Sequence, residues 1–187
     1  MSISFLLAAI IFPASEILLS VIKRSKKSNS TIEDQGTMKT LWLVIGISTL
    51  LAVAFSILPK AQFFLPLSVS HIFSIVCMVV GLCIRWSAIV TLGRMFTTNV
   101  AIQKDHELVR EGLYAYIRHP SYSGLLLEFI GLGFFFANWV SIIILVVPIT
   151  IAVLIRITAE EKVLINALGE SYTTYTSETK RLIPRLW

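Results

Sequence analysis

Residues 122–157 read YSGLLLEFIGLGFFFANWVSIIILVVPITIAVLIRI, an apolar stretch long enough to cross a bilayer and return. Two candidate spans, 122–137 and 139–157, are separated by Asn138 alone. Because the connection has only one residue, the second span must run antiparallel to the first and beside it. The sequence therefore predicts a tight antiparallel helical hairpin inside a membrane.

Polar residues stand at both ends of this hairpin. Residues 118–124 read RHPSYSG directly before it, and Arg156, Glu160 and Glu161 lie where it ends. Pro120 restricts the residue before it and is favourable at the start of a helix, so it predicts the point of helix entry. A hairpin brings its two ends to one membrane face, so these groups should lie close together. Because ionisable groups are costly at a membrane, this cluster is the first place to look for chemistry.

Composition places the whole chain in the membrane class. The chain has 187 residues and is 56% hydrophobic, and its mean hydropathy is +0.81. Such a chain is too apolar for an ordinary soluble domain. We expect an all-α integral membrane protein forming a single domain over residues 1–187. Its five predicted spans are 3–22, 40–58, 67–90, 122–137 and 139–157. Residues 1–90 hold the first three, and residues 91–187 hold the linker, the hairpin and the C-terminal tail, where the chemistry is expected.

Basic residues predict the orientation of these spans. Most of the 16 lysines and arginines fall within residues 23–39, 94–118 and 162–185. With five spans, all three segments lie on one side, and the excess of Lys and Arg marks that side as cytoplasmic. We therefore expect the N-terminus outside and the C-terminus in the cytoplasm. The net charge of +5 is then explained by topology, and no nucleic-acid partner is expected.

The cytoplasmic segments are expected to carry structure of their own. Residues 91–121 form a linker that mixes polar and apolar side chains, and Gly112 favours a turn within it. After the hairpin, a helix over 160–168 should end at Gly169, and a second short helix is predicted over 171–179. Cys77 and Cys83 lie in an apolar segment without a further ligand, so they do not indicate a metal site.

Two arginines allow more than one interpretation. Arg156 and Glu160 are four residues apart and share one helix face, so a simple salt bridge that fixes the helix at the headgroups is one possibility. Arg85 lies within a predicted span, followed by Trp86. We favour a snorkelling side chain at the interface for Arg85, with a position near a substrate entrance as the alternative.

The combination of RHPSYSG with Arg156 and the Glu160-Glu161 pair, at this spacing, resembles the isoprenylcysteine carboxyl methyltransferase family. More broadly, it resembles the membrane methyltransferases that include the phospholipid methyltransferases. The resemblance extends from about residue 99 to residue 187, whereas the first three spans are similar in hydropathy only. Eukaryotic members have further N-terminal spans, so a chain with five spans is similar to a minimal prokaryotic member, archaeal or bacterial.

This resemblance implies S-adenosylmethionine as the cofactor and S-adenosylhomocysteine as its product. It also implies that a methyl group is transferred, at the cytoplasmic membrane face, to the carboxylate of an isoprenylcysteine-like lipophilic substrate, either a small molecule or a prenylated peptide. Arg156 matches the substrate-side arginine, Glu161 is a further catalytic candidate, and no metal is expected. The linker and C-terminal helices would form the cofactor pocket. The matching cofactor positions are Gln103, His106, Glu107, Leu108, Val109, Tyr114, His119, Pro120, Ser121, Tyr122 and Glu160.

Two other functions remain open from the sequence. A phospholipid or other lipid methyltransferase would use the same cofactor with an amine acceptor, and it would need a base such as His119 or Glu161 to remove a proton. A carboxylate acceptor is ionised at neutral pH and needs no strong base. The second alternative is a small transporter or a non-catalytic membrane protein, which would also explain an intramembrane arginine.

Overall fold

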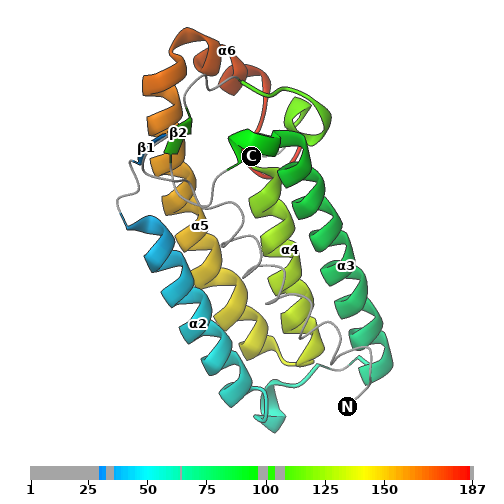
Figure 1. Cartoon of the computed structure of the whole chain (residues 1–187). Coiled ribbons are helices and arrows are strands. Elements are labelled where there is room, and N and C mark those ends of the chain that lie inside the picture. Colours follow the sequence, from blue (N-terminus) through cyan, green and yellow to red (C-terminus); the bar gives the residue numbers. More distant parts are fainter. Residues whose placement is uncertain (1–29, 33–35, 64, 97–100, 104–107, 186–187) are drawn as a thin grey trace.

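Four long helices lie side by side in the computed structural model, which describes residues 30–32, 36–63, 65–96, 101–103 and 108–185. Across the molecule their order is α2, α5, α4 and α3 (Figure 1). The short helix α6 and the strands lie at one end of these helices (Figure 1). The helices are α2 (Thr37–Phe55), α3 (Leu67–Leu92), α4 (Pro120–Phe135), α5 (Trp139–Leu168) and α6 (Glu170–Glu178); the strands are β1 (Ser30–Ile32) and β2 (Ala101–Gln103); and short 3-10 turns occupy Pro59–Ala61, Gly93–Met95 and Gly112–Ala115.

The predicted helical fold class is confirmed, with one addition. Strands β1 and β2 pair antiparallel, with Ser30 opposite Gln103 and Ile32 opposite Ala101. Neither strand was expected, because each has only three residues and lies in a polar part of the chain. Strand β2, which belongs to the linker, contacts α5.

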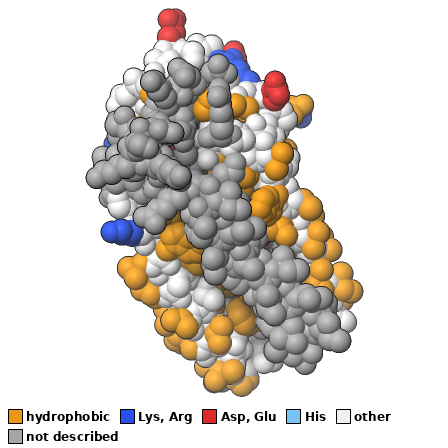
Figure 2. Space-filling view, in the orientation of Figure 1, with side chains coloured by type: hydrophobic (Ala, Val, Ile, Leu, Met, Phe, Trp, Pro, Cys, Tyr) orange, Lys and Arg blue, Asp and Glu red, His pale blue; other side chains and the backbone are white. Residues whose placement is uncertain are grey.

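Three described helices are long and apolar enough to span a membrane, namely α2, α3 and α5. Helix α4 has 16 residues, fewer than the roughly 20 that a bilayer requires. The predicted first span, 3–22, lies outside the described residues. The protein is thus a multi-pass membrane protein, and the count of five spans stays a prediction. In Figure 2, hydrophobic side chains are spread over the visible surface away from the α6 end, and the visible acidic side chains lie at the α6 end.

The turn between α4 and α5 is built around Asn138. Its side-chain oxygen accepts hydrogen bonds from the backbone N–H groups of Val140 (2.9 Å) and Ser141 (3.1 Å), which caps α5. Its Nδ2 donates to the carbonyls of Phe55 and Leu58 at 3.4 and 3.3 Å, so the turn is also tied to the end of α2. The connection comprises residues 136–138 rather than one residue, because α4 begins at Pro120 and ends at Phe135.

Helix α4 packs more extensively on α3 than on its hairpin partner α5. Glycines make this close approach possible. A Cβ atom added to Gly124 would lie 2.5 Å from the carbonyl oxygen of Gly81 and 2.8 Å from the backbone nitrogen of Arg85. One added to Gly81 would meet the carbonyl of Gly124 at 2.7 Å. Small residues at such crossings let membrane helices come into backbone contact.

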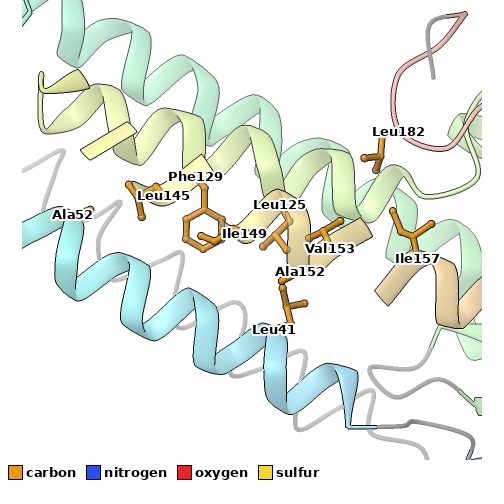
Figure 3. Close-up of a cluster of buried hydrophobic side chains, with 10 residues drawn as sticks. All are labelled: Leu41, Ala52, Leu125, Phe129, Leu145, Ile149, Ala152, Val153, Ile157 and Leu182. Carbon is orange, nitrogen blue, oxygen red and sulfur yellow. The ribbon is translucent and has the colours of Figure 1, made fainter. Parts of the chain in front are cut away.

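Helix α5 is the centre of the buried core. The aliphatic side chains that it buries pack against α2 on one side and against α4 on the other (Figure 3). Within a membrane this packing stabilises the fold through close contact rather than through exclusion of water. The buried cluster consists of Leu41 and Ala52 from α2, Leu125 and Phe129 from α4, Leu145, Ile149, Ala152, Val153 and Ile157 from α5, and Leu182 from the C-terminal segment.

The end of α5 agrees with the sequence prediction. The helix continues without a break past Ile157 to Leu168 and ends at Gly169, whose φ of 57° suits glycine. Helix α6 follows within one residue of its predicted bounds. Gly112, with φ of 58°, opens the 3-10 turn of the linker as expected. These turns bring α6 and the linker together beside the start of α4.

Candidate active site

Tyr122 connects the two ends of the predicted polar cluster. The Nε of Arg156 donates a hydrogen bond to the Tyr122 hydroxyl at 2.7 Å. That hydroxyl in turn donates to Oε2 of Glu160 at 3.0 Å. Arg156 is 1% exposed. It lies on α5 next to α4, so the hydroxyl of Tyr122, which comes from α4, can reach it. The two side chains that share a face of α5 are thus bridged by a tyrosine.

A groove lies next to Arg156, between α2 and α5. It has a volume of about 450 Å³ and is lined by two threonines of α2 and by apolar side chains. Arg156 reaches its edge, because Nη1 donates to Oγ1 of Thr37 at 2.9 Å and Thr37 lines the groove. A cationic group therefore lies at the polar end of an apolar space. The lining residues are Thr37, Thr40, Val44, Pro148, Ile151, Ala152 and Ile155.

Glu161 points to a different set of partners from Glu160. Its Oε1 accepts from Nε of Arg118 at 2.8 Å and lies 3.3 Å from Nε2 of His119. Its Oε2 accepts from Nε and Nη2 of Arg181 at 3.0 and 2.8 Å. Residues of the linker, of α5 and of the segment after α6 thus meet at one buried carboxylate.

The segment after α6 is paired with the entry to α4. The backbone N–H groups of Arg118 and His119 donate to the carbonyls of Lys180 (2.7 Å) and Arg181 (3.0 Å). Ser123 Oγ donates to the carbonyl of Leu182 at 2.6 Å. Arg118 also donates through Nη1 to the carbonyl of Thr179. This pairing places the C-terminal segment against the RHPSYSG stretch.

Helix α6 holds the linker tyrosine in place. Tyr175 donates from its hydroxyl to the carbonyl of Tyr114 at 2.6 Å. Burial raises the pKa of Tyr175 to about 12. Burial, with the carboxylate of Glu160 as a smaller cause, also raises the pKa of Tyr114. Both hydroxyls therefore keep their protons at neutral pH and remain hydrogen-bond donors. Tyr114 is buried beside the cluster.

The favoured interpretation of Arg85 as a snorkelling side chain is wrong. Arg85 is 8% exposed, and its Nη1 donates to both the carbonyl oxygen (3.1 Å) and the hydroxyl (2.9 Å) of Ser121. The close crossing at Gly124 brings α3 near enough for Arg85 to reach the first turn of α4. The arginine thus supports the helix on which Ser121 and Tyr122 lie.

The structure gathers only part of the predicted cofactor set. His119, Pro120 and Ser121 are buried at the start of α4. Leu108 and Val109 are half-buried in the linker, and Gln103 is placed only through its backbone in β2. The remaining two residues, His106 and Glu107, lie outside the described residues.

The sequence does not single out two of the polar side chains at the site. These are Thr37 and Arg181, the second of which is one of the basic residues that predict the topology. A third polar residue, Glu128, is 2% exposed in α4 and packs against Gly81. An acidic residue inside an apolar stretch is itself a signal of function, and that signal was available for Glu128. No comparable pattern marks Thr37 or Arg181.

The sequence model of the isoprenylcysteine carboxyl methyltransferase family matches residues 74–166, from within α3 to near the end of α5. This range contains Arg85, the RHPSYSG stretch, Arg156 and the Glu160-Glu161 pair. The chain belongs to the isoprenylcysteine carboxyl methyltransferase family.

Two curated relatives carry the name of this family's enzymes. Protein-S-isoprenylcysteine O-methyltransferase of Schizosaccharomyces pombe is 38% identical over 106 residues, which cover 56% of this chain and 45% of that protein. Protein-S-isoprenylcysteine O-methyltransferase B of Arabidopsis thaliana is 34% identical over 114 residues, covering 60% of this chain and 58% of the relative. The match thus spans about half the length of these relatives. Both are eukaryotic and give the expected prokaryotic origin no support.

A solved structure of the same family has a similar fold. The eukaryotic intramembrane Ras methyltransferase ICMT (isoprenylcysteine carboxyl methyltransferase) is 28% identical to this chain, and the two align with a TM-score of 0.58. The alignment covers 80% of this chain and 51% of the other. This family member therefore shares a membrane fold with a longer protein.

Proposed function

We propose that this family member is an S-adenosylmethionine-dependent methyltransferase that methylates the carboxylate of an isoprenylcysteine-like lipophilic substrate. The observation that carries the proposal is the buried guanidinium of Arg156 at the edge of an apolar groove. A substrate with an anionic head and an apolar tail matches both features. Arg156 would hold the carboxylate by a charge-assisted hydrogen bond, and the tail would lie between α2 and α5.

The polar and aromatic side chains beside Arg156 fit the cofactor. Among the described residues, Glu160 accepts a hydrogen bond from Tyr122 alone, so the carboxylate keeps acceptor sites for a cationic or polar ligand. His119 and Ser121 line the same start of α4, and Tyr114 supplies an aromatic ring from the linker. S-adenosylmethionine supplies an activated methyl group, so the protein has to orient the acceptor and exclude water. We assign Glu160, Tyr122, His119 and Tyr114 to holding it.

The charge at the acceptor end favours a carboxylate over an amine. A protonated amine would be repelled by the buried Arg156, whereas a carboxylate is attracted to it. An ionised carboxylate also needs no base to act as a nucleophile. The site would face the cytoplasm, as the distribution of Lys and Arg predicts, so the cofactor would enter from water and the substrate tail from the bilayer.

A methylation assay tests this function directly. We expect purified protein in lipid vesicles to transfer labelled methyl from S-adenosylmethionine to a farnesylated or geranylgeranylated cysteine derivative with a free carboxylate. The product should release its label in alkali, because methyl esters hydrolyse there and methylamines do not. The controls are an amide-blocked prenylcysteine and an amine phospholipid. Alkali-stable label on the phospholipid would identify an amine methyltransferase, and failure to bind S-adenosylhomocysteine would favour a non-enzymatic membrane protein.

Filling the groove should weaken use of the lipophilic substrate. We expect Thr40→Trp to lower kcat/KM for the prenylcysteine about tenfold, since loss of apolar contact worth about 1.4 kcal/mol corresponds to that factor. The affinity for S-adenosylhomocysteine should stay unchanged. The matched control is Leu43→Trp, which adds the same indole to α2 at an exposed position outside the groove. Equal losses in the two variants would show that the tail does not lie there.

A further inference from the structure

We propose that Glu161 is a positioning residue, which fixes the ring of His119 and the tautomer of its imidazole at the wall of the cofactor pocket. The inference rests on the proposed function for the role of His119. It replaces the earlier expectation that Glu161 takes part in the chemistry itself. Two observations carry it: the number of donors around the carboxylate, and the restraint on His119 from both sides.

The carboxylate of Glu161 is fully occupied. Two oxygens of a carboxylate offer about four acceptor sites. Four nitrogens surround them at 2.8–3.3 Å: Arg118 Nε and His119 Nε2 at Oε1, and Arg181 Nε and Nη2 at Oε2. A general base needs an acceptor site that faces the proton it removes. Glu161 has each site directed at a protein nitrogen, so positioning is the role that its geometry allows.

His119 is restrained from two directions. Its backbone N–H donates to the carbonyl of Arg181 at 3.0 Å, and its own carbonyl accepts from Tyr122 and Ser123 at 3.0 and 3.2 Å. These bonds fix the main chain at the start of α4. Among the described residues, the hydrogen-bonding contact that fixes the ring is the one with Glu161 at 3.3 Å. The ring is buried, with its centroid 5.9 Å from that of Tyr122.

The contact also selects a tautomer. An ionised carboxylate only accepts hydrogen bonds, so Nε2 must carry a proton to bind it. In the neutral imidazole Nδ1 is then the acceptor. Arg118 and Arg181 keep the carboxylate ionised by balancing its charge. Glu161 thereby determines which ring nitrogen of His119 can accept a hydrogen bond from a ligand.

The first test determines the tautomer of His119 and does not depend on methyl transfer. The chain has three histidines, so protein labelled with 15N at histidine gives a spectrum in which His119→Gln identifies the His119 signals. We expect the wild type to show a proton on Nε2 at neutral pH, and Glu161→Gln to change that pattern. The control Glu178→Gln removes an exposed carboxylate that pairs with Arg110 and should leave the pattern unchanged. A proton on Nδ1 in the wild type, or the same His119 signals in Glu161→Gln, would overturn the proposal.

A variant with a shorter acidic side chain provides the test if Glu161→Gln does not fold. Glu161→Asp keeps the charge but draws the carboxylate back by one methylene, away from Nε2 of His119. We expect it to fold, to melt within a few degrees of the wild type, and to lose the Nε2 proton signature. If the aspartate variant folds and keeps that signature, Glu161 does not determine the tautomer.

The second test asks whether Glu161 acts through His119. In calorimetry, Glu161→Gln should weaken binding of S-adenosylhomocysteine about tenfold, and His119→Gln by a similar factor. The double variant should be no weaker than His119→Gln alone, because residues that act as one unit are not additive. Losses that multiply would contradict the proposal. If the wild type binds no S-adenosylhomocysteine, the proposed function fails, while the tautomer experiment still decides the role of Glu161.

Discussion

Replacing Arg156 with glutamine will lower kcat/KM for the prenylcysteine about 100-fold or more while leaving the binding of S-adenosylhomocysteine within a few-fold of the wild type. Glutamine keeps much of the bulk and a donor but removes the charge that attracts the carboxylate. A misplaced acceptor loses a factor of about 100 even when it still binds. Initial-rate kinetics and calorimetry on the same preparation measure the two effects separately.

Glu160→Gln should have the opposite effect to Arg156→Gln, because it should weaken binding of the cofactor. It therefore serves as the matched comparison. It changes a neighbouring side chain on the same face of α5, one that is linked to Arg156 through Tyr122. Cofactor affinity should fall about tenfold, as for the loss of a hydrogen bond to a charged group. Thr37→Val removes the partner of Arg156 Nη1 but keeps the charge, and it should cost far less than Arg156→Gln. If Arg156→Gln abolishes cofactor binding and spares the prenylcysteine, the roles of Arg156 and Glu160 have been assigned the wrong way round.

Replacing Gly124 with valine will destabilise the protein more than any other substitution considered for the helix bundle. A Cβ at this position would lie 2.5 Å from the carbonyl oxygen of Gly81, and this neighbour is backbone that cannot move aside. Overpacking of this kind costs about 1–3 kcal/mol or more. The thermal midpoint in detergent should fall by about 5 °C or more. As α3 and α4 separate, Arg85 loses Ser121, so cofactor affinity should fall as well.

Gly46→Val is the matched control for this prediction. Gly46 lies inside α2, and a Cβ atom there would meet no atom of the other described segments within 4 Å. The same isopropyl group is thus added to a membrane helix at a position with space for it. We expect the midpoint to change by less than about 2 °C, since the helix propensities of the two residues differ by a fraction of a kcal/mol. A Gly124→Val variant as stable as Gly46→Val would mean that α3 and α4 do not cross at these glycines.

Local patterns in the sequence were sufficient to predict the described helices, although the predicted ends of α2 and α4 differ from the observed ones by two or three residues. The apolar runs indicate α2, α3 and α5, and Gly169 marks the end of α5 because few other residues tolerate its backbone conformation. The spacing of Arg156 and Glu160 correctly places them on one helix face. The turn at Asn138 predicted that α4 and α5 would be neighbours. It could not predict that α4 would pack mainly on α3, because glycine spacing reveals a crossing only once the partner helix is known.

The partners of Glu161 could not be predicted from the sequence. Arg181 reaches Glu161 because the chain after α6 turns back toward the start of α4, and that path depends on tertiary contacts such as Tyr175 with Tyr114. The same limit applies to Thr37, whose contact with Arg156 joins residues 119 positions apart. The inward direction of Arg85 follows from the depth of the α3–α4 crossing, which residue types alone do not give.

The pairing of the chain after α6 with the start of α4 has a consequence for the order of biosynthesis. A ribosome completes α2 to α5 before it adds Arg181 and Leu182, whose carbonyls accept from His119 and Ser123. The helices can therefore enter the membrane one after another while the nascent chain grows, but the cluster around Glu161 closes only after α6 has emerged. Membrane insertion and maturation of the site are thus successive events in the life of the chain.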